Sequence, residues 1–594
     1  MKLKIMLAFV YGCITLLSLA QKQPLINLRY EENITPTYQE VIDMYKRLDA
    51  HYKNAVLLEK GLTDSGKPLH LFVINNEMEF NPEKIKAKGK AVLLINNGIH
   101  AGEPAGVDAS LQFAADILQN KNRMASVLKD AVIIIIPAYN IGGMLNRSAW
   151  HRANQTSPAE TGFRGNAANL DLNRDFTKCD SENTKTFTRL FHEWDPDVFL
   201  DTHTTNGSDH QYSITLIAPQ PDVFPGVQGK FIRGKMLPEL YAKMKKGEYD
   251  LIPYVDWYYD DPRHGIRMTQ ESPRYSSGYA RMFHSYGMIT EALIYKPFAD
   301  RVKSTYQFIR VLSDFTAENA EMIIRTRKQG RAESQALNSY PIRYELDSSR
   351  YRLMEFKGYE YDKNQVSRLT GLPRPGYDTS RKFNDTIRFY DVYKPVERIK
   401  VPEYYILPQA WATVVERLKL NGVEFYRLKN DTVLEVEVDY ITDFTSPQRP
   451  YNGHYYHDKV TTASEIQKIK YHAGDLVIPV NQEKIAYIIE MLEPKAVDSF
   501  FRWNFFDSIL DAREYFSSYG FEENALKYLE EHPEFMQEFL NKRMNDYEFA
   551  NDHRAQLAWI YNNSEWAEES YRRYPAGRIY SRINNLHLLV YSGK

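Results

Sequence analysis

The stretch "AVLLINNGIHAGEPAGVDASLQFAADILQN", residues 91–120, combines an apolar run, a polar turn and a helical pattern. The run at 91–96 has the length and the continuous apolar character of a buried strand. The turn then presents His100 and Glu103, three residues apart, before the helical spacing begins. Such a pair is typical either of an ordinary polar turn or of half a metal site. The remainder of the chain decides between the two.

Further apolar runs follow, separated by helical patterns, over residues 21 to about 325. "AVIIIIPAYN" (131–140), "DVFLDTH" (197–203) and "GMITEALIY" (287–295) have the same buried-strand character. Continuous apolar strands that alternate with helices predict an α/β fold, in which helices flank a mixed, mainly parallel sheet on both faces. In such sheets ligands bind at the carboxyl ends of the strands, which is where the polar turn falls.

The composition changes near residue 335, after a helical pattern at 305–332 that predicts a long closing helix. "GLPRPGYDTSRKF" (371–383) is typical of a loop, "TVLEVEVDY" (432–440) alternates like a half-buried strand, and helical patterns dominate further on. We therefore expect four parts in chain order: a signal peptide at 1–20, an α/β domain at 21–330, a strand-rich accessory domain at 335–480, and a helical region at 481–594.

The N-terminus, "MKLKIMLAFVYGCITLLSLAQ", places two lysines before a short apolar stretch that ends at a small-residue site. This pattern predicts a secretory signal peptide cleaved near Ala20, and therefore a secreted or periplasmic protein. No later apolar run is long enough to span a membrane, so we expect no transmembrane span in the mature chain. Once the signal is removed, Cys179 is the only cysteine, which excludes an internal disulfide.

The bulk composition describes a globular protein with more than one core. The chain has 594 residues, of which 43% are hydrophobic and 26% charged. Its net charge of −2 gives no electrostatic basis for nucleic acid or an anionic membrane as the main partner. Nothing in the composition indicates the oligomeric state.

Two more candidate residues lie in the apolar strands. His203 ends one run, and Glu291 is the single carboxylate inside another. A charge in that position costs several kcal/mol unless it has a partner or faces a cavity. Two histidines and one carboxylate with an open fourth position make a catalytic zinc site, so His100, Glu103 and His203 predict one Zn²⁺ per chain. Glu291 would then act as the general acid and base beside the attacking water.

The segment "FRGNAANLDLNRDF" (163–176) makes this interpretation specific. Together with His100, Glu103, His203 and Glu291, this segment resembles the motifs of the zinc metallocarboxypeptidase family. Its residue sequence is most similar to that of the carboxypeptidase N/E/D-like branch. The resemblance covers roughly a third of the chain. Four motifs in the right order are far more specific than any one of them.

The resemblance implies that residues 21–330 are a carboxypeptidase-like catalytic domain. It also implies that Arg164 stabilises the oxyanion and that Asn173 and Arg174 bind the terminal carboxylate of a peptide or protein substrate. These residue types suit those roles, because a guanidinium grips a carboxylate with two parallel hydrogen bonds. A fixed positive charge beside the reacting carbonyl stabilises the negative charge that develops there.

Several assignments stay open. Two other arginines, Arg147 and Arg152, are alternative candidates for the residue that stabilises the oxyanion. The Asn-Pro-Asp-Gly motif that is usual in the family is replaced by "NIGG" at residues 140–143. Either Tyr275 or Tyr279 could be the tyrosine that caps the substrate. Asp201 either orients a ligand imidazole or is an ordinary strand-end residue. The residue that sets side-chain preference is not identifiable.

The leading hypothesis is an exported zinc-dependent carboxypeptidase that hydrolyses the last peptide bond with a metal-activated water. The same site could serve cell-wall peptides, as an amidase or peptidase. A non-catalytic protein that binds peptides or glycans is a third hypothesis, which the presence of a complete ligand set and of Glu291 disfavours. Elsewhere, His454 and His457 lie three residues apart, where a surface loop is favoured over a second metal site.

Overall fold

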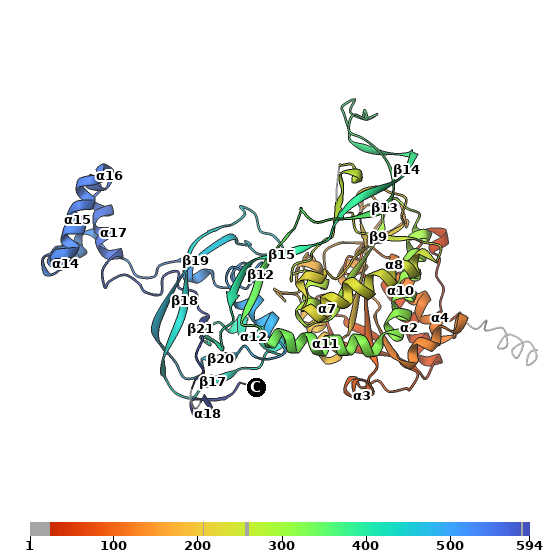
Figure 1. Ribbon diagram of the computed structural model, residues 1–594, viewed down its shortest axis with the longest axis horizontal. Helices are drawn as coiled ribbons and strands as arrows, with labels where there is room; N and C mark the ends of the chain where they lie inside the picture. The colour runs from red at the N-terminus through yellow and green to blue at the C-terminus, as the bar shows by residue number, and fades with distance from the viewer. Residues whose placement is uncertain (1–23, 206, 256–259, 584–585, 594) are drawn as a thin grey trace, which may run out of the picture. The chain divides into compact units, whose positions relative to one another are not determined.

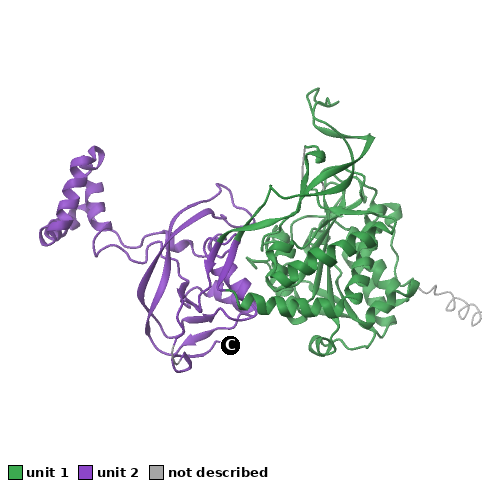
Figure 2. Ribbon diagram, viewed as in Figure 1, with its two compact units in different colours: residues 1–337, 343–397 green, residues 338–342, 398–594 purple. Residues whose placement is uncertain are grey.

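The computed structural model describes residues 24–205, 207–255, 260–583 and 586–593 (Figure 1). The predicted signal peptide at 1–20 lies outside the described residues. The chain divides into two compact units (Figure 2). Unit 1 comprises residues 1–337 and 343–397, and unit 2 comprises residues 338–342 and 398–594.

Unit 1 is built on an eight-stranded sheet with the order β1-β2-β4-β3-β7-β11-β8-β9. Four neighbouring pairs are parallel and three are antiparallel, so the predicted mixed, mainly parallel sheet is confirmed. The strands are β1 (Ala55–Leu62), β2 (Pro68–Ile74), β3 (Ala91–Asn97), β4 (Ala131–Ile136), β7 (Val198–Thr205), β8 (Ile214–Ile217), β9 (Leu251–Pro253) and β11 (Tyr286–Leu293).

Helices cover both faces of this sheet, because its central strands are apolar on both sides. In β7, Val198 and Leu200 join the core formed with α2, α4 and α10, whereas Phe199 packs on the opposite side against Phe187 and Phe191 of α6. The helices named here are α2 (Tyr38–His51), α4 (Ala105–Leu118), α6 (Glu182–Trp194) and α10 (Phe298–Glu318). Shorter helices are α3 (Pro82–Ala87), α5 (Ile141–Leu145), α7 (Gly226–Phe231), α8 (Leu237–Lys245) and α9 (Ser276–Met282).

The long closing helix predicted at 305–332 is two helices. α10 ends at Glu318, and α11 (Ala320–Gln335) begins after Asn319, whose φ of −117° leaves the helical range. The side-chain amide of Asn319 donates to the Phe315 carbonyl oxygen at 3.0 Å, which satisfies one of the orphan carbonyls at the helix end.

A long hairpin after α11 packs back onto unit 1. Its strands, β13 (Arg352–Asp362) and β14 (Gly376–Tyr390), form a three-stranded sheet with the two-residue strand β10 (Ile266–Arg267). The hairpin is flanked by β12 (Ser339–Leu346) and β15 (Tyr393–Lys400), which pair with each other. Residues 343–397 therefore cluster with the α/β unit, and the predicted divisions at 335 and 480 stay a prediction.

Unit 2 contains a seven-stranded sheet with the order β19-β18-β21-β16-β20-β17-β22. The alternating run predicted as a strand at 432–440 lies within β18, where it pairs with β19 in antiparallel register. The strands are β16 (Tyr404–Leu407), β17 (Tyr426–Leu428), β18 (Thr432–Thr445), β19 (Asp458–Tyr471), β20 (Leu476–Pro479), β21 (Gly577–Ile579) and β22 (Val590–Ser592).

The remaining helices of unit 2 are α12 (Ala412–Leu420), α13 (Ile485–Leu492), α14 (Ser518–Glu531), α15 (Pro533–Asn545), α16 (Tyr547–Ala550), α17 (His553–Asn562) and α18 (Leu586–Leu589). Helices α14 to α17 bury a small core of their own around Phe539 and Leu557. His457 is buried and is held by Ser446 and Asp507 at 2.6 and 2.8 Å. Among all described residues, no helix combines the length and apolar character that crossing a membrane requires.

Candidate metal centre and its cavity

Three neighbouring strands bring the candidate residues to one edge of the sheet. β3 and β7 run parallel with Asn97 opposite Thr202, so the turn after β3 lies beside the end of β7. β11 runs parallel to β7 on its other side and places Glu291 directly opposite His203. Residues that are about 190 positions apart in sequence thus meet because parallel strands end at the same edge.

Two glycines shape the turn that carries His100. Gly98 has a φ of 67°, a conformation that glycine adopts without the strain of a side chain. Gly106, in the first turn of α4, approaches β7 so closely that an added Cβ would lie 1.9 Å from Thr202 Oγ1. The turn and the start of α4 are therefore packed directly against the strand that supplies the second histidine.

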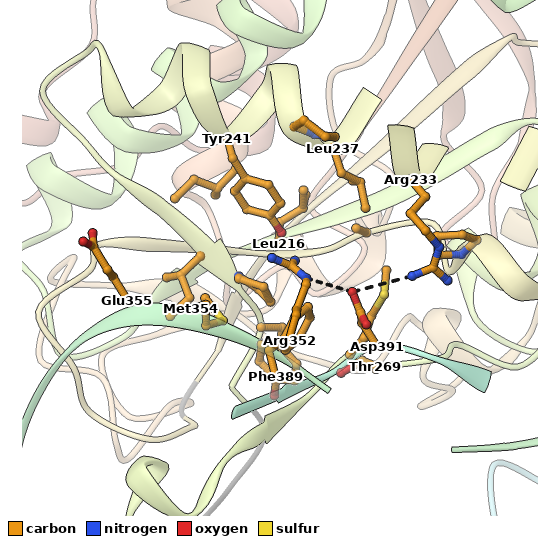
Figure 3. A pocket seen from close by; sticks show the side chains of 18 of the residues that line it. Leu216, Arg233, Leu237, Tyr241, Thr269, Arg352, Met354, Glu355, Phe389 and Asp391 are labelled. Atoms are coloured by element: carbon orange, nitrogen blue, oxygen red, sulfur yellow. Dashed lines mark hydrogen bonds and ion pairs between the residues drawn. The ribbon is translucent and has the colours of Figure 1, made fainter. Parts of the chain in front are cut away.

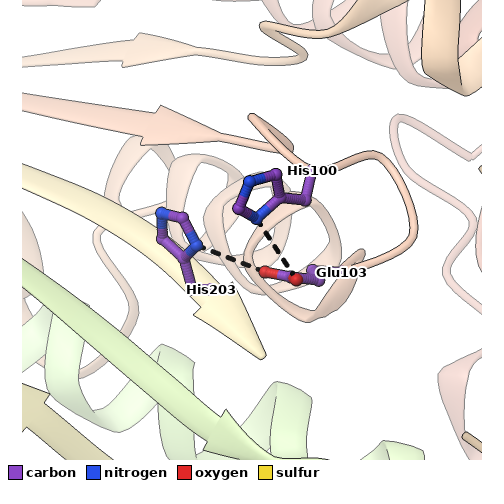
Figure 4. A group of neighbouring side chains, drawn as sticks. All are labelled: His100, Glu103 and His203. Carbon is purple, nitrogen blue, oxygen red and sulfur yellow. Dashed lines mark ion pairs between the residues drawn. The ribbon is translucent and has the colours of Figure 1, made fainter. Parts of the chain in front are cut away.

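His100, Glu103 and His203 converge on one point (Figure 4). One ligand-capable atom from each lies within 4.8 Å of the others. The Nδ1 atoms of His100 and His203 face the two carboxylate oxygens of Glu103 at 3.2 and 3.3 Å. All three side chains are buried, with 3 to 4% of their surface exposed. Two imidazole nitrogens and one carboxylate are the donor set that zinc prefers, so these residues fit the metal.

Each histidine is oriented by a second carboxylate. The Nε2 atom of His100 lies 2.9 Å from Asp171 Oδ1, and that of His203 lies 3.0 Å from Asp201 Oδ2. When these Nε2 atoms carry the proton, the Nδ1 lone pairs are left for a metal. Burial raises the pKa of Asp171, but the charges of His100 and Arg164 outweigh burial and hold that pKa well below its usual range.

Glu103 and Glu291 are adjacent carboxylates with opposite tendencies. Burial opposes ionisation of Glu103, yet the neighbouring His100 and Arg152 hold its pKa well below its ordinary value. Burial, with the charges of Glu103 and Glu271, raises the pKa of Glu291 to about 8. The Oε2 atom of Glu291 is buried and makes no hydrogen bond to any residue in the described part of the chain. One carboxylate is thus suited to hold a cation and the other to exchange a proton.

The rival arginines lie in different places. Arg152 donates to Glu103 Oε1 at 2.7 Å and to the Thr204 carbonyl oxygen at 3.1 Å. Arg164 pairs with Asp171 at 2.9 Å and reaches within 3.5 Å of Glu103, with 46% of its side chain exposed. Arg147 lies elsewhere.

Arg147 binds the N-terminal segment, donating to the carbonyl oxygens of Thr35 and Pro36 at 3.2 Å each. It does not line the cavity described below. Two arginines, and not one, therefore border the candidate metal ligands.

Asn173 and Arg174 occupy a short 3₁₀ turn at the same cavity. The side-chain oxygen of Asn173 accepts from the backbone N–H of Ser276 at 3.0 Å, which ties this turn to the start of α9. The Arg174 guanidinium lies over the ring of Tyr275, 4.4 Å from its centre. Tyr279 is fully buried and its hydroxyl lies 3.2 Å from His192 Nε2, so of the two candidate tyrosines it is Tyr275 that lines the cavity.

All seven predicted site residues line one cavity of about 520 Å³. Other residues that were not predicted from sequence also line this cavity, among them His151, Asn154, Ile217, Tyr254, Thr269, Glu271 and Ile289. Ile289 could have been found, because it lies two positions before Glu291 in β11 and successive odd positions share a face. The others come from loops and from a neighbouring strand, with no periodic signal to identify them.

Comparisons with known proteins give consistent results. Residues 41–209 match the family model for zinc carboxypeptidases, a segment that includes the three candidate metal ligands. Carboxypeptidase 2 of Trichophyton tonsurans is 22% identical over 439 residues, covering 68% of this chain and 72% of the relative. Carboxypeptidase 2 of Trichophyton rubrum is 22% identical over 436 residues, with the same two coverages.

Two solved structures are similar over about half of the chain. A metallo-carboxypeptidase from Burkholderia cenocepacia has 15% identity and a TM-score of 0.36, covering 48% of this chain and 69% of that one. Carboxypeptidase A from Helicoverpa armigera has 13% identity and a TM-score of 0.36, covering 54% and 80%.

Proposed function

Because this chain belongs to the zinc carboxypeptidase family, we propose that it is an exported enzyme that removes C-terminal residues from peptides or proteins. His100, Glu103 and His203 would hold one Zn²⁺. The observation that carries the proposal is the convergence of these three side chains on the wall of a cavity that also contains Arg174 and Glu291. Export rests on the N-terminal sequence pattern alone.

The bound metal would lower the pKa of a water and polarise the substrate carbonyl. Glu291 takes the proton from the attacking water and returns it to the leaving amine, a role that its raised pKa suits. Its position opposite His203 in the sheet keeps the carboxylate beside the reacting atoms. The Oε2 atom of Glu291 makes no hydrogen bond to the described residues, so it is free to accept this proton.

Arg174 binds the terminal carboxylate of the substrate, and Asn173 holds the turn that carries it. Tyr275 covers the guanidinium with its ring and is the tyrosine that closes over the substrate end. A peptide with a blocked C-terminus would leave Arg174 without its anion, so we expect such peptides to be poor substrates.

The two remaining arginines have different roles. Arg152 already donates to Glu103 and to a backbone carbonyl, so it holds the metal ligand in place. Arg164 is nearly half exposed and binds Asp171 through its Nε and one terminal amino group. Its other terminal amino group, 3.5 Å from Glu103, would stabilise the oxyanion of the tetrahedral intermediate.

Mass spectrometry of a peptide library tests the proposal. The mature protein, loaded with zinc, is expected to remove residues stepwise from free C-termini, and a chelator should stop the reaction. Glu291→Gln should retain the metal and lose activity, whereas Glu435→Gln, a change at an exposed position of unit 2, should act as wild type. Internal cuts, cleavage of cell-wall peptides only, or no cleavage by the zinc-loaded protein would each contradict it.

A further inference from the structure

A second cavity in unit 1, of about 690 Å³, lies apart from the candidate metal ligands. One wall comes from the edge of the large sheet and from α8, with Leu216, Leu237 and Tyr241 (Figure 3). The opposite wall is the β13–β14 hairpin, with Met354 and Phe389. Its volume is in the range of small-molecule sites, and its walls are largely apolar.

One end of this cavity presents two hydrogen-bond donors. The Tyr241 hydroxyl points toward the Arg352 guanidinium in Figure 3. Burial raises the pKa of Tyr241, and the charge of Arg352 offsets part of that rise. Among the described residues the Tyr241 hydroxyl has no hydrogen-bond partner. Arg352 uses its Nε to bind Asp391 at 2.9 Å and stacks on Phe389 with 4.7 Å to the ring centre. The rotation of Arg352 is thereby restricted, while its two terminal amino groups make no hydrogen bond to the described residues.

The charges around the cavity leave a positive excess. Five cationic side chains line it against three carboxylates. Lys357 pairs with Asp250 at 3.0 Å, and Lys245 pairs with Glu355 at 3.5 Å, so these four charges neutralise one another. Asp391 lies 2.9 Å from the Arg352 guanidinium and 3.6 Å from that of Arg233, which also pairs with Asp222 at 2.8 Å. The donors left for an anion are therefore the terminal amino groups of Arg352.

We propose that this cavity binds an apolar molecule that carries one carboxylate. The carboxylate accepts hydrogen bonds from the Tyr241 hydroxyl and from the terminal amino groups of Arg352. The apolar body packs between Leu216 and Leu237 on one side and Met354 on the other. Both a fatty acid and a peptide that ends in an apolar residue have this chemistry.

The site is separate from the proposed catalytic one but adjoins it. Tyr254 and Thr269 line both cavities. An anion could therefore also be captured by Arg174 in the catalytic cavity, and the test has to distinguish the two places.

Isothermal titration calorimetry of the full, metal-free chain with decanoate and with N-acetyl-phenylalanyl-phenylalanine provides that test. We expect one molecule of at least one probe to bind per chain. Tyr241→Phe removes a single hydroxyl without changing the shape of the wall, and should weaken binding by about tenfold, the loss of one hydrogen bond to a charged group. Binding of decanoate alone would identify fatty acids as the ligand, and binding of the dipeptide alone would identify peptide ends.

A cavity-filling pair gives an independent measurement. Met354→Trp is expected to abolish binding, because the indole occupies the space of the ligand body. Leu353→Trp is the matched control: it is the neighbouring residue of β13, it is 64% exposed, and it does not line the cavity. Unchanged binding in both Tyr241→Phe and Met354→Trp, loss of binding in Arg174→Met, or no binding of either probe to wild type would overturn the proposal. Activity against peptides plays no part in these readouts, so a failure here is distinct from a failure of the proposed function.

Discussion

Each unit contains a buried cluster of charges, and the two clusters are built differently. In unit 2, one arginine serves three carboxylates: Arg578 reaches Asp439 at 2.5 Å, Glu493 at 2.6 Å and Glu437 at 3.1 Å. A hydroxyl, that of Tyr405, also donates to Glu493. We call this cluster closed, because each of its carboxylates accepts hydrogen bonds from a donor within the same unit.

The cluster in unit 1 opens onto a cavity. His100 and His203 turn their Nδ1 atoms toward the carboxylate of Glu103, and Glu291 keeps a buried oxygen without a hydrogen bond to the described residues. Both arrangements carry the desolvation penalty of buried charge. Only the open one offers a position that a cation and a substrate can share. A buried ionic cluster therefore indicates chemistry when it lines a cavity and is incomplete, and indicates structure when it is closed.

The largest effect is expected when the same substitution is made in both clusters. Glu103→Gln removes a metal ligand and should lower zinc affinity by more than about 100-fold. Loss of a residue that only orients a ligand lowers metal affinity by at most about that factor, so loss of the ligand itself should cost more. Glu493→Gln should leave zinc affinity unchanged and reduce the free energy of unfolding by about 1–3 kcal/mol, because the buried hydrogen bonds from Arg578 and Tyr405 lose their charged acceptor while Asp439 and Glu437 still pair with the arginine. Zinc titration with a competing chelator and urea unfolding measure the two quantities. The comparison fails if Glu493→Gln loses zinc or if Glu103→Gln keeps it.

The next comparison concerns the two arginines beside Glu103. Arg164→Met should lower kcat by roughly 10²- to 10³-fold, as removal of an oxyanion donor does, with the zinc affinity unchanged. Arg152→Met should instead lower zinc affinity by about 10- to 100-fold, because Glu103 loses the donor at 2.7 Å that orients it. Steady-state kinetics at saturating zinc, together with the zinc titration, separate the effects. If the two variants exchange these phenotypes, the roles of the arginines are reversed.

Much of unit 1 could be predicted from sequence because its strands are buried on both faces. The continuous run at 91–96 has no polar side to obscure it, and parallel strands bring their ends together whatever lies between them. That is why His100, Glu103 and His203 could be expected to meet. Glu291 stood out because a carboxylate is rare within an apolar run.

The parts that sequence did not predict depend on long-range packing. The β13–β14 hairpin joins unit 1 through β10, where Ile266 pairs with Phe389, over a hundred positions away, and neither strand carries a local signal of its partner. Tyr275 and Tyr279 lie in one short segment, and Tyr279 is the buried one because rings from distant parts of the chain, including those of Phe176 and Phe191, pack against it. The break between α10 and α11 falls at an asparagine that a helical pattern tolerates.

The smallest effect concerns a buried acid that neither cluster contains. Asp108 in α4 is fully buried, its Oδ2 accepts from Thr35 Oγ1 at 2.7 Å, and burial raises its pKa to about 8. An unfolded aspartate has a pKa of about 3.9. Between these values the folded state keeps a proton that the unfolded state has released, so stability falls as the pH rises through this window. In unit 2, by contrast, the buried Asp439 pairs with the Arg578 guanidinium at 2.5 Å.

Asp108→Asn removes this titration and keeps the hydrogen bond, since the amide oxygen can still accept from Thr35. Between pH 6 and 7.5 the wild type is expected to lose about 1–2 kcal/mol relative to the variant, which follows from a slope of at most about 1.4 kcal/mol per pH unit. Hydrogen exchange of peptides from α4, corrected for the intrinsic pH dependence of exchange, measures the difference. Asp443→Asn, at an exposed position of unit 2, makes the same charge change and should leave the exchange of α4 as in wild type at both pH values. A parallel pH dependence in wild type and Asp108→Asn would contradict this prediction, because it would mean that Asp108 is ionised in the folded protein.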